Sequence, residues 1–262
     1  MYRFTTGLVI AGLVLMFGVT RSSGEPLNPT VSDVNLNTAG GTGALETVTE
    51  PANSNTAFGF NALFSNTSGS FNTANGTSAL YLNTAGIRNT ATGTDALYSN
   101  TSGNFNVAMG ALALFSNTSG SFNTVNGTSA LYLNTTGSRN TATGVHALAS
   151  NATGASNTAI GYLALVYSTG NKNIALGNGA GAALASGNRN IYLGHPGATS
   201  ESKTMRLGSE QTKTYIAGVT TAAVTGLIIT WSSTPVASLE CRSPRRATSE
   251  TSRQWGRVVR GC

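Results

Sequence analysis

The chain has 262 residues and a net charge of +6, and only 9% of its residues are charged while 32 are glycine. Soluble proteins usually carry roughly a quarter charged residues, so Asn, Ser and Thr must keep this surface hydrated. The hydrophobic share of 40% excludes an intrinsically disordered chain, because such chains combine low hydrophobicity with high charge.

Residues 1–24 are predicted to be a cleavable secretory signal. Arg3 precedes an apolar run from Gly7 to Val19, and small residues stand before Glu25. The run is too short for a comfortable membrane span, although an uncleaved N-terminal anchor remains the alternative. The body of the chain is therefore expected to be secreted or held at the bacterial cell surface, without an integral membrane anchor later in the chain.

From residue 55 onward the sequence repeats with a period of 17 residues, apart from one unit of 16. The units begin at Asn55, Asn72, Asn89, Asn106, Asn123, Asn140, Asn157, Asn173 and Asn190. Residues 25–54 are assigned to an N-terminal linker and a degenerate first unit beginning at Asn37. A fixed period of this length predicts a solenoid rather than a globular core.

Each unit has two short halves. The first half is Asn-Thr-Ala-x-Gly and the second is Ala-Leu-aromatic followed by Asn-Thr-Ser-Gly or a variant. Such short segments, bounded by residues that favour tight turns, predict two strands and two turns per unit. The expected fold is all-β, a parallel β-solenoid whose coils stack about 4.8 Å apart with like residues in register. The x position is expected to point inward, and the Thr two residues before it to share that inward face.

Stacking in register places like side chains in columns. One column of leucines is expected to be a buried core ladder: Leu63, Leu80, Leu97, Leu114, Leu131, Leu148 and Leu165. The adjacent aromatic column is expected on the opposite face: Phe64, Tyr81, Tyr98, Phe115 and Tyr132. An outward apolar stripe is a candidate partner-binding surface, and a purely structural ring stack is the alternative.

The repeats "NTAIGYLAL" (157–165) and "NKNIALGNGAG" (171–181) resemble the heads of trimeric autotransporter adhesins, the YadA-like heads with the motif Asn-x-x-Ala-Ile-Gly. The resemblance covers roughly residues 37–194, within which residues 55–194 are assigned to the head repeats. It implies a left-handed β-roll, a homotrimer, and attachment to a host or environmental surface through an unknown protein or polysaccharide ligand. The coiled-coil stalk and membrane barrel of that family are not recognised in this chain.

Residues 190–219 resemble the segment that precedes an endosialidase-type intramolecular chaperone domain in phage tail fibres. Residues 195–226 are assigned to a short β-rich connector. A one-nucleotide frame shift would permit that domain's expected motifs from "PVASLE" and "RATSETSRQWG". This predicts a frameshift near Gly226, with residues 227–262 an out-of-frame tail. A genuine disordered basic tail is the alternative, since this segment holds six of the chain's arginines and both cysteines, Cys241 and Cys262.

We identify no catalytic, metal-binding or cofactor-binding residue from the sequence. Asp95 and His146 occupy units three coils apart, about 14 Å, which is too far for an acid–base pair. His195 before Pro196 indicates a turn. Asn-x-Ser/Thr triplets recur at Asn66, Asn75, Asn100, Asn117 and Asn151, where turn chemistry is favoured over glycosylation. No cofactor and no nucleic-acid partner are expected.

The leading functional prediction is a non-enzymatic, exported, adhesive protein that presents repeated surfaces. One alternative is a phage-tail-fibre-like receptor-binding protein that has lost a self-cleaving chaperone domain. The other is an ice- or surface-binding solenoid, because Thr56, Thr73, Thr90 and Thr141 recur in an ordered array. The inward orientation expected for these threonines weakens this last alternative.

Overall fold

The computed structural model describes residues 31–32, 36–48 and 52–213. Within these ranges the chain forms twelve short strands and no helix. The strands are β1 (Val31–Ser32), β2 (Thr38–Gly40), β3 (Thr56–Phe58), β4 (Thr73–Asn75), β5 (Thr90–Thr92), β6 (Val107–Met109), β7 (Thr124–Asn126), β8 (Thr141–Thr143), β9 (Thr158–Ile160), β10 (Ile174–Leu176), β11 (Ile191–Leu193) and β12 (Met205–Leu207).

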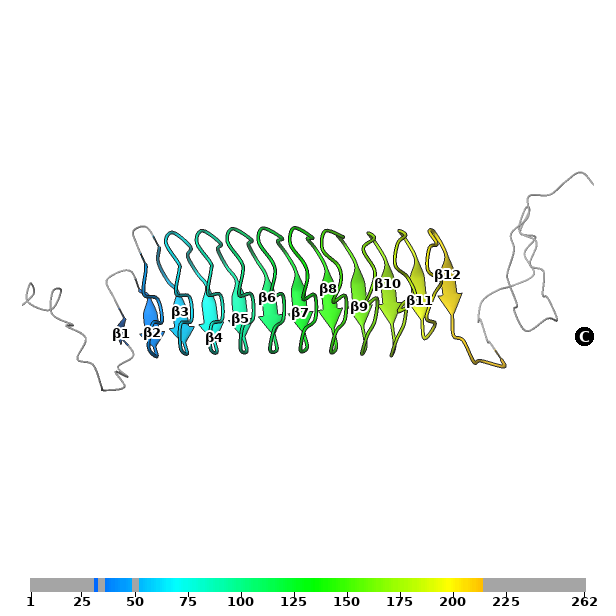
Figure 1. The fold of residues 1–262 in the computed structure, drawn as a ribbon, viewed down its shortest axis with the longest axis horizontal. Helices are drawn as coiled ribbons and strands as arrows, with labels where there is room; N and C mark the ends of the chain where they lie inside the picture. Colours follow the sequence, from blue (N-terminus) through cyan, green and yellow to red (C-terminus); the bar gives the residue numbers. More distant parts are fainter. Residues whose placement is uncertain (1–30, 33–35, 49–51, 214–262) are drawn as a thin grey trace, which may run out of the picture. The chain divides into compact units, whose positions relative to one another are not determined.

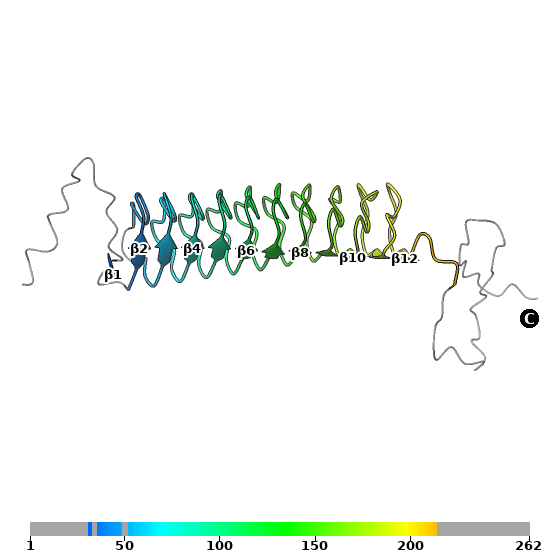
Figure 2. The same ribbon diagram turned by 90° about the horizontal axis from the view of Figure 1, so that it is seen from below.

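Strands β2 to β12 form one parallel sheet in which every strand pairs with the next along the chain. The register is that of the repeat, with Thr56 opposite Thr73 and Thr73 opposite Thr90. Figure 1 shows these strands as a single row, and Figure 2 shows that they occupy one side of the stack of coils. The predicted all-β parallel solenoid with coils of about 17 residues is confirmed. Only β1 is antiparallel, to β2.

The prediction of two strands per coil is wrong for the second half of each unit. That half is a tight turn, in which the Ala79 N–H donates to the carbonyl of Gly76 at 3.3 Å. The following leucine has a positive φ, 55° at Leu80 and 54° at Leu97. Its N–H donates to the next coil, as from Leu80 to the Ala96 carbonyl at 2.9 Å. The second half of each unit therefore forms hydrogen bonds with the next coil although its backbone is not in the extended conformation of a strand.

The core is a narrow double column of alanine and leucine. The middle residue of almost every strand is a buried alanine, such as Ala74 or Ala91, with valine at β7 and tyrosine at β11. The seven ladder leucines are each fully buried: Leu63, Leu80, Leu97, Leu114, Leu131, Leu148 and Leu165. Burying a leucine contributes roughly 1.5–3 kcal/mol, whereas the left-handed backbone conformation costs about 1–2 kcal/mol per residue. Burial therefore offsets the backbone strain of each leucine.

Two columns of buried asparagines flank this core and link successive coils. At the coil start, Asn89 Nδ2 donates to Asn72 Oδ1 at 3.2 Å and to the Gly103 carbonyl at 2.8 Å, and Asn89 Oδ1 accepts the Asn106 N–H at 3.0 Å. In the second column, Asn100 Nδ2 donates to the same Gly103 carbonyl at 3.0 Å. Because buried amides are costly unless hydrogen-bonded, these ladders fix the coil-to-coil register.

The coils approach so closely at one corner that only glycine fits. Gly93 follows strand β5 and has φ +129°, and a Cβ there would lie 2.7 Å from the carbonyl carbon and oxygen of Gly110 in the next coil. A side chain would therefore meet rigid backbone as well as a disfavoured φ.

The solenoid extends beyond residue 194, because β12 pairs in register with β11. Before β3, the coil that begins at Asn37 contributes β2. The solenoid belongs to the first of the two units into which the chain divides, residues 1–210. The predicted signal (1–24), the predicted tail (227–262) and both cysteines lie outside the described residues.

Candidate functional site

The outer face of the sheet is formed by the first and third residues of every strand. At β4 the central Ala74 is buried, whereas Thr73 and Asn75 on either side of it are exposed. The expectation that the x position and its neighbouring threonine point inward is therefore wrong. The strand does alternate with period two, but the small alanine is the side chain that fits the narrow core.

This outer face changes character along the stack. Strands β3 to β8 present mostly threonine at the first position and mixed residues at the third. β9 still has Thr158 at the first position and Ile160 at the third, and from β10 onward both positions are apolar. The exposed apolar side chains are Ile160, Ile174, Leu176, Leu193, Met205 and Leu207, which we call the apolar face. Contiguous exposed apolar surface of this kind usually marks an interface.

The predicted aromatic stripe is a continuous stack of rings. Successive centroids of Phe64, Tyr81, Tyr98, Phe115 and Tyr132 lie 5.0–5.2 Å apart, with interplanar angles of 8–16°. All five side chains are half-buried. Since the ring faces already contact one another, only ring edges and the tyrosine hydroxyls remain for a partner. Whether this stripe binds a partner stays a prediction.

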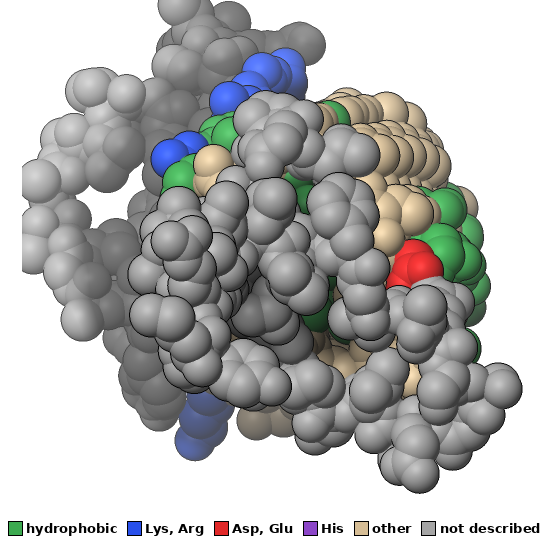
Figure 3. Space-filling view, turned by 90° about the vertical axis from the view of Figure 1, so that its left-hand side faces the viewer, with side chains coloured by type: hydrophobic (Ala, Val, Ile, Leu, Met, Phe, Trp, Pro, Cys, Tyr) green, Lys and Arg blue, Asp and Glu red, His purple; other side chains and the backbone are tan. Residues whose placement is uncertain are grey.

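A second column, which sequence reasoning missed, lies at the last position of the repeat. We call it the cation–aromatic column. It consists of Phe71, Arg88, Phe105, Phe122, Arg139, Ser156, Lys172, Arg189 and Lys203, all exposed. The alternation of Phe with Arg at 17-residue spacing was the available signal. Figure 3 shows Lys and Arg side chains close to hydrophobic ones at the upper left.

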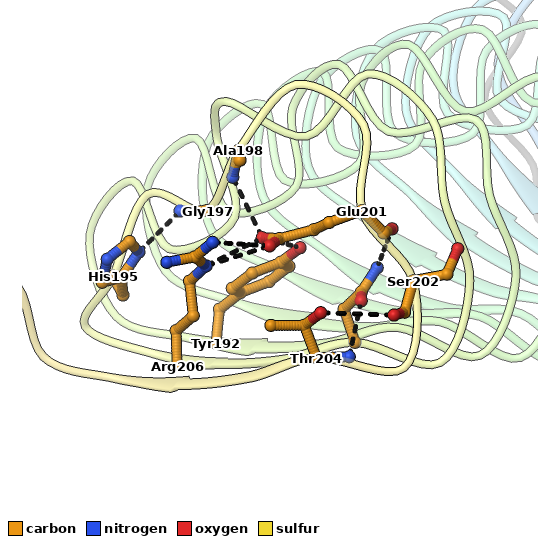
Figure 4. Close-up of polar contacts among 9 residues, drawn as sticks. Tyr192, His195, Gly197, Ala198, Glu201, Ser202, Thr204 and Arg206 are labelled. Carbon is orange, nitrogen blue, oxygen red and sulfur yellow. Dashed lines mark hydrogen bonds and ion pairs between the residues drawn. The ribbon is translucent and has the colours of Figure 1, made fainter. Parts of the chain in front are cut away.

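The last coil holds a polar cluster around Glu201 (Figure 4). Glu201 Oε1 accepts the Tyr192 hydroxyl at 2.9 Å and the Ala198 N–H at 3.0 Å, and Arg206 Nη2 donates to Oε2 at 2.8 Å. The hydrogen bond from Arg206 is the largest cause that lowers the pKa of Glu201. Burial, then the bond to Glu201, raises the pKa of Tyr192.

This cluster is suited to closing the end of the core. Tyr192 replaces the usual alanine and is fully buried, so its ring fills the interior of the last coil while Glu201 satisfies its hydroxyl. His195 Nδ1 accepts the Gly197 N–H at 2.8 Å, and burial lowers its pKa, which favours the neutral ring. Both carboxylate oxygens of Glu201 thus accept hydrogen bonds from within the coil. This arrangement stabilises the coil, and it leaves neither oxygen available to act as a general base.

The remaining sequence candidates lie apart from this cluster. Asp95 and His146 occupy equivalent turn positions with φ of 55° and 56° in coils three repeats apart. Asn66, Asn100, Asn117 and Asn151 are fully buried within the second asparagine column. Their amides donate to glycine carbonyls three residues on, such as Gly69. Within the described ranges, no three His, Cys, Asp or Glu side chains gather as a metal site would require.

Comparison with known families, characterised proteins and solved structures gave no match for this chain. The part of the chain that the structure describes holds no helix long and apolar enough to cross a bilayer. The candidate functional surfaces are therefore defined by the solenoid's own outer columns: the apolar face, the aromatic stripe and the cation–aromatic column.

Proposed function

We propose that this protein is a non-enzymatic, exported structural protein that attaches to a surface through the outer columns of its solenoid. The observation that supports this most is the unbroken register of β2 to β12, which repeats each exposed side chain at the coil spacing. Such a surface suits multivalent contact with an extended partner, because identical weak contacts add along its length. Residues 37–194 also resemble adhesin heads.

We further propose that three copies associate through the apolar face. The side chains of Ile174 and Leu176 on β10, and of Leu193 on β11, project from one flat sheet and are 37–50% exposed. Another copy presents a face that is apolar and flat in the same way, so a second copy is a suitable occupant. The number of three copies follows from the resemblance of residues 37–194 to adhesin heads. This interface would leave the threonine-rich strands β3 to β8 and the cation–aromatic column available to a ligand.

Sedimentation of the full-length chain tests this assembly. We expect a trimer for the unmodified protein and a monomer for Leu176→Asp/Leu193→Asp, which buries two charges in the interface. The matched control is Asn75→Asp/Asn126→Asp, at the same repeat position on the polar part of the sheet, and it should remain trimeric. A monomeric unmodified protein, or equal behaviour of both variants, would contradict the proposed interface.

Attachment is tested separately by coating beads with the full-length protein and measuring their adhesion to bacterial and host cell surfaces. Uncoated beads and beads coated with heat-denatured protein serve as controls. Adhesion that depends on the folded protein supports the proposed function, whereas equal adhesion by denatured protein counts against it.

A second candidate function is favoured by the outward threonines. Thr56, Thr73, Thr90, Thr124, Thr141 and Thr158 form a column on the outer face, interrupted by Val107. An ordered hydroxyl array can bind an ice surface, but the neighbouring column is mixed, with Phe58, Asn75 and Met109. A thermal-hysteresis measurement on the full-length protein decides this: a freezing-point gap would favour ice binding, and its absence would remove that candidate.

A further inference from the structure

The cation–aromatic column concentrates the unpaired positive charge of the solenoid. Between residues 52 and 210 there are six Lys or Arg residues, and five of them lie in this column. The sixth, Arg206, pairs with Glu201. None of the five forms an ion pair with a carboxylate of the described residues. The column is therefore an exposed line of positive charge with no paired counter-charge among residues 52–213.

Backbone geometry holds the column straight. Its members have φ between 56° and 61°, and each N–H donates to a carbonyl of the preceding coil, as from Arg88 to Ser70 and from Phe105 to Ile87, both at 3.0 Å. A left-handed conformation costs a non-glycine residue about 1–2 kcal/mol. The same conformation recurs at Ser54 and Ser156, so the coil requires it whatever side chain stands there. It fixes where the side chains of the column leave the backbone.

Stacking orients the charged groups. Arg88 Cζ lies 5.3 Å from the ring centroids of both Phe71 and Phe105. Phe105 stacks on Phe122 at 5.0 Å with an interplanar angle of 4°, and Arg139 Cζ lies 5.9 Å from the Phe122 centroid. With its flat faces covered, a guanidinium exposes its in-plane N–H edge, which is the group that binds an oxyanion bidentately. Exposed aromatic edges also carry partial positive charge.

We propose that this column binds a linear carboxylated polysaccharide, one carboxylate group to each cation. This inference deepens the proposed adhesive function and depends on it. The column runs over eight coil spacings, about 38 Å, and its last three members place cations in successive coils about 4.8 Å apart. Arg88 and Arg139 stand three coils apart, and Arg139 and Lys172 two, so the closely spaced cations are the last three. These three match a narrow polymer that bears a regular row of anions.

Other polyanions fit this column less well. Single-stranded nucleic acid binds by stacking bases on open aromatic faces, whereas here Arg88 lies over the rings of Phe71 and Phe105, and Phe105 stacks on Phe122. An extended acidic peptide presents side chains on one face every second residue, about 6.6 Å apart, which does not match the coil spacing.

The test measures binding of immobilised polygalacturonate to the full-length protein at low and physiological salt. Neutral dextran, dextran sulfate and poly-dT are the comparison polymers. We expect binding to polygalacturonate that weakens with salt, because exposed charges are screened. Binding no stronger than to neutral dextran would overturn the proposal. Tighter binding of dextran sulfate would assign the column to sulfated glycans, and tighter binding of poly-dT would assign it to nucleic acid; either would overturn a carboxylated ligand.

Two triple variants locate the site. Lys172→Gln/Arg189→Gln/Lys203→Gln removes three column charges, and we expect an affinity loss of about tenfold, roughly a factor of two per exposed contact. The control Arg242→Gln/Arg245→Gln/Arg246→Gln changes the net charge equally within residues 227–262, and it should change affinity less than twofold. Equal losses in both variants would show that binding follows net charge and would overturn the proposal.

A charge-neutral variant tests the stacking. Phe105→Leu keeps every cation but removes one ring from beside Arg88, and we expect a two- to threefold loss of affinity with no further loss when Arg88→Gln is added. An unchanged affinity would overturn the orienting role of the rings. Adhesion of coated beads without any polysaccharide binding would remove this inference while leaving the proposed function standing.

Discussion

At the scale of single residues, the buried asparagines determine how one coil is placed on the next. Asn100 illustrates this: its Nδ2 donates to Asn83 Oδ1 at 2.7 Å, and its Oδ1 accepts from Asn117 Nδ2 at 2.8 Å. Each side-chain amide therefore forms hydrogen bonds with the equivalent asparagines of both neighbouring coils. A ladder of this kind is cooperative, since removal of one member leaves unpaired groups in both neighbours.

We predict that Asn100→Ala lowers the free energy of unfolding by about 3 kcal/mol. The variant leaves Asn83 Oδ1 buried without its donor, and each buried unsatisfied group costs about 1–3 kcal/mol in addition to the cavity. Urea denaturation followed by circular dichroism measures the change. The control Ser102→Ala, two residues away and exposed, should change stability by less than about 0.5 kcal/mol. Equal effects would mean that the ladder does not hold the register.

At the scale of the coil, the glycine that follows each strand limits how closely coils can pack. We predict that Gly93→Ala destabilises by about 3 kcal/mol, because φ is +129° and the added Cβ meets the backbone of Gly110. Gly194 occupies the same position in the last coil, but it has φ +61° and no atom within 4 Å of an added Cβ. Gly194→Ala should therefore cost only about 1 kcal/mol. Denaturant titration of both variants separates coil packing from backbone preference, and equal losses would assign the whole effect to φ.

The last coil should loosen in acid. Arg206 lowers the pKa of Glu201 below its ordinary value of 4.5, so this group stabilises the folded coil above that pH. The contribution is lost as pH falls through the lowered folded pKa. We expect hydrogen-exchange protection of the Ile191 N–H, which donates to the Thr204 carbonyl, to fall as the pH drops below 4.5, after correction for intrinsic rates.

The Glu201→Gln variant should show weaker protection of Ile191 at neutral pH and no such acid step. Asp95→Asn, in a distant coil, is the control and should keep the step seen in the unmodified protein. An acid step that persists in Glu201→Gln would assign it to another group.

The repeat predicts the architecture well and the local conformation less well. A 17-residue period with leucine at one position is enough to predict coils, their register and the buried ladder, because stacking places like residues together. The conformation of Leu80 is not predictable in this way, because no local preference favours a left-handed leucine, and only burial compensates for it. The cation–aromatic column was missed because Phe71 and Arg88 differ in type, and their contact appears only when the coils are stacked.

At the scale of the whole molecule, stability should depend on the number of coils and on their phase. Each coil contacts only its neighbours, so an integral number of units can be removed without changing any remaining interface. Residues 72–122 are three units, or 51 residues, and their deletion joins Phe71 to Asn123 with every column continuous. We expect this variant to fold cooperatively, with a lower unfolding midpoint and a solenoid shortened by about 14 Å in small-angle scattering.

A deletion that stops half a coil out of phase provides the contrast. Removing residues 72–114 joins Phe71, the last residue of one unit, to Phe115 in the middle of another. The asparagine, leucine and glycine side chains after the junction then no longer stack on like side chains of the coil before it. Buried amides then face apolar side chains and lose their partners, which costs more than the loss of the coils themselves. The longer variant should therefore be the less stable one, although it retains eight more residues. Stability that followed chain length instead of phase would show that the side-chain ladders do not specify the stacking of this solenoid.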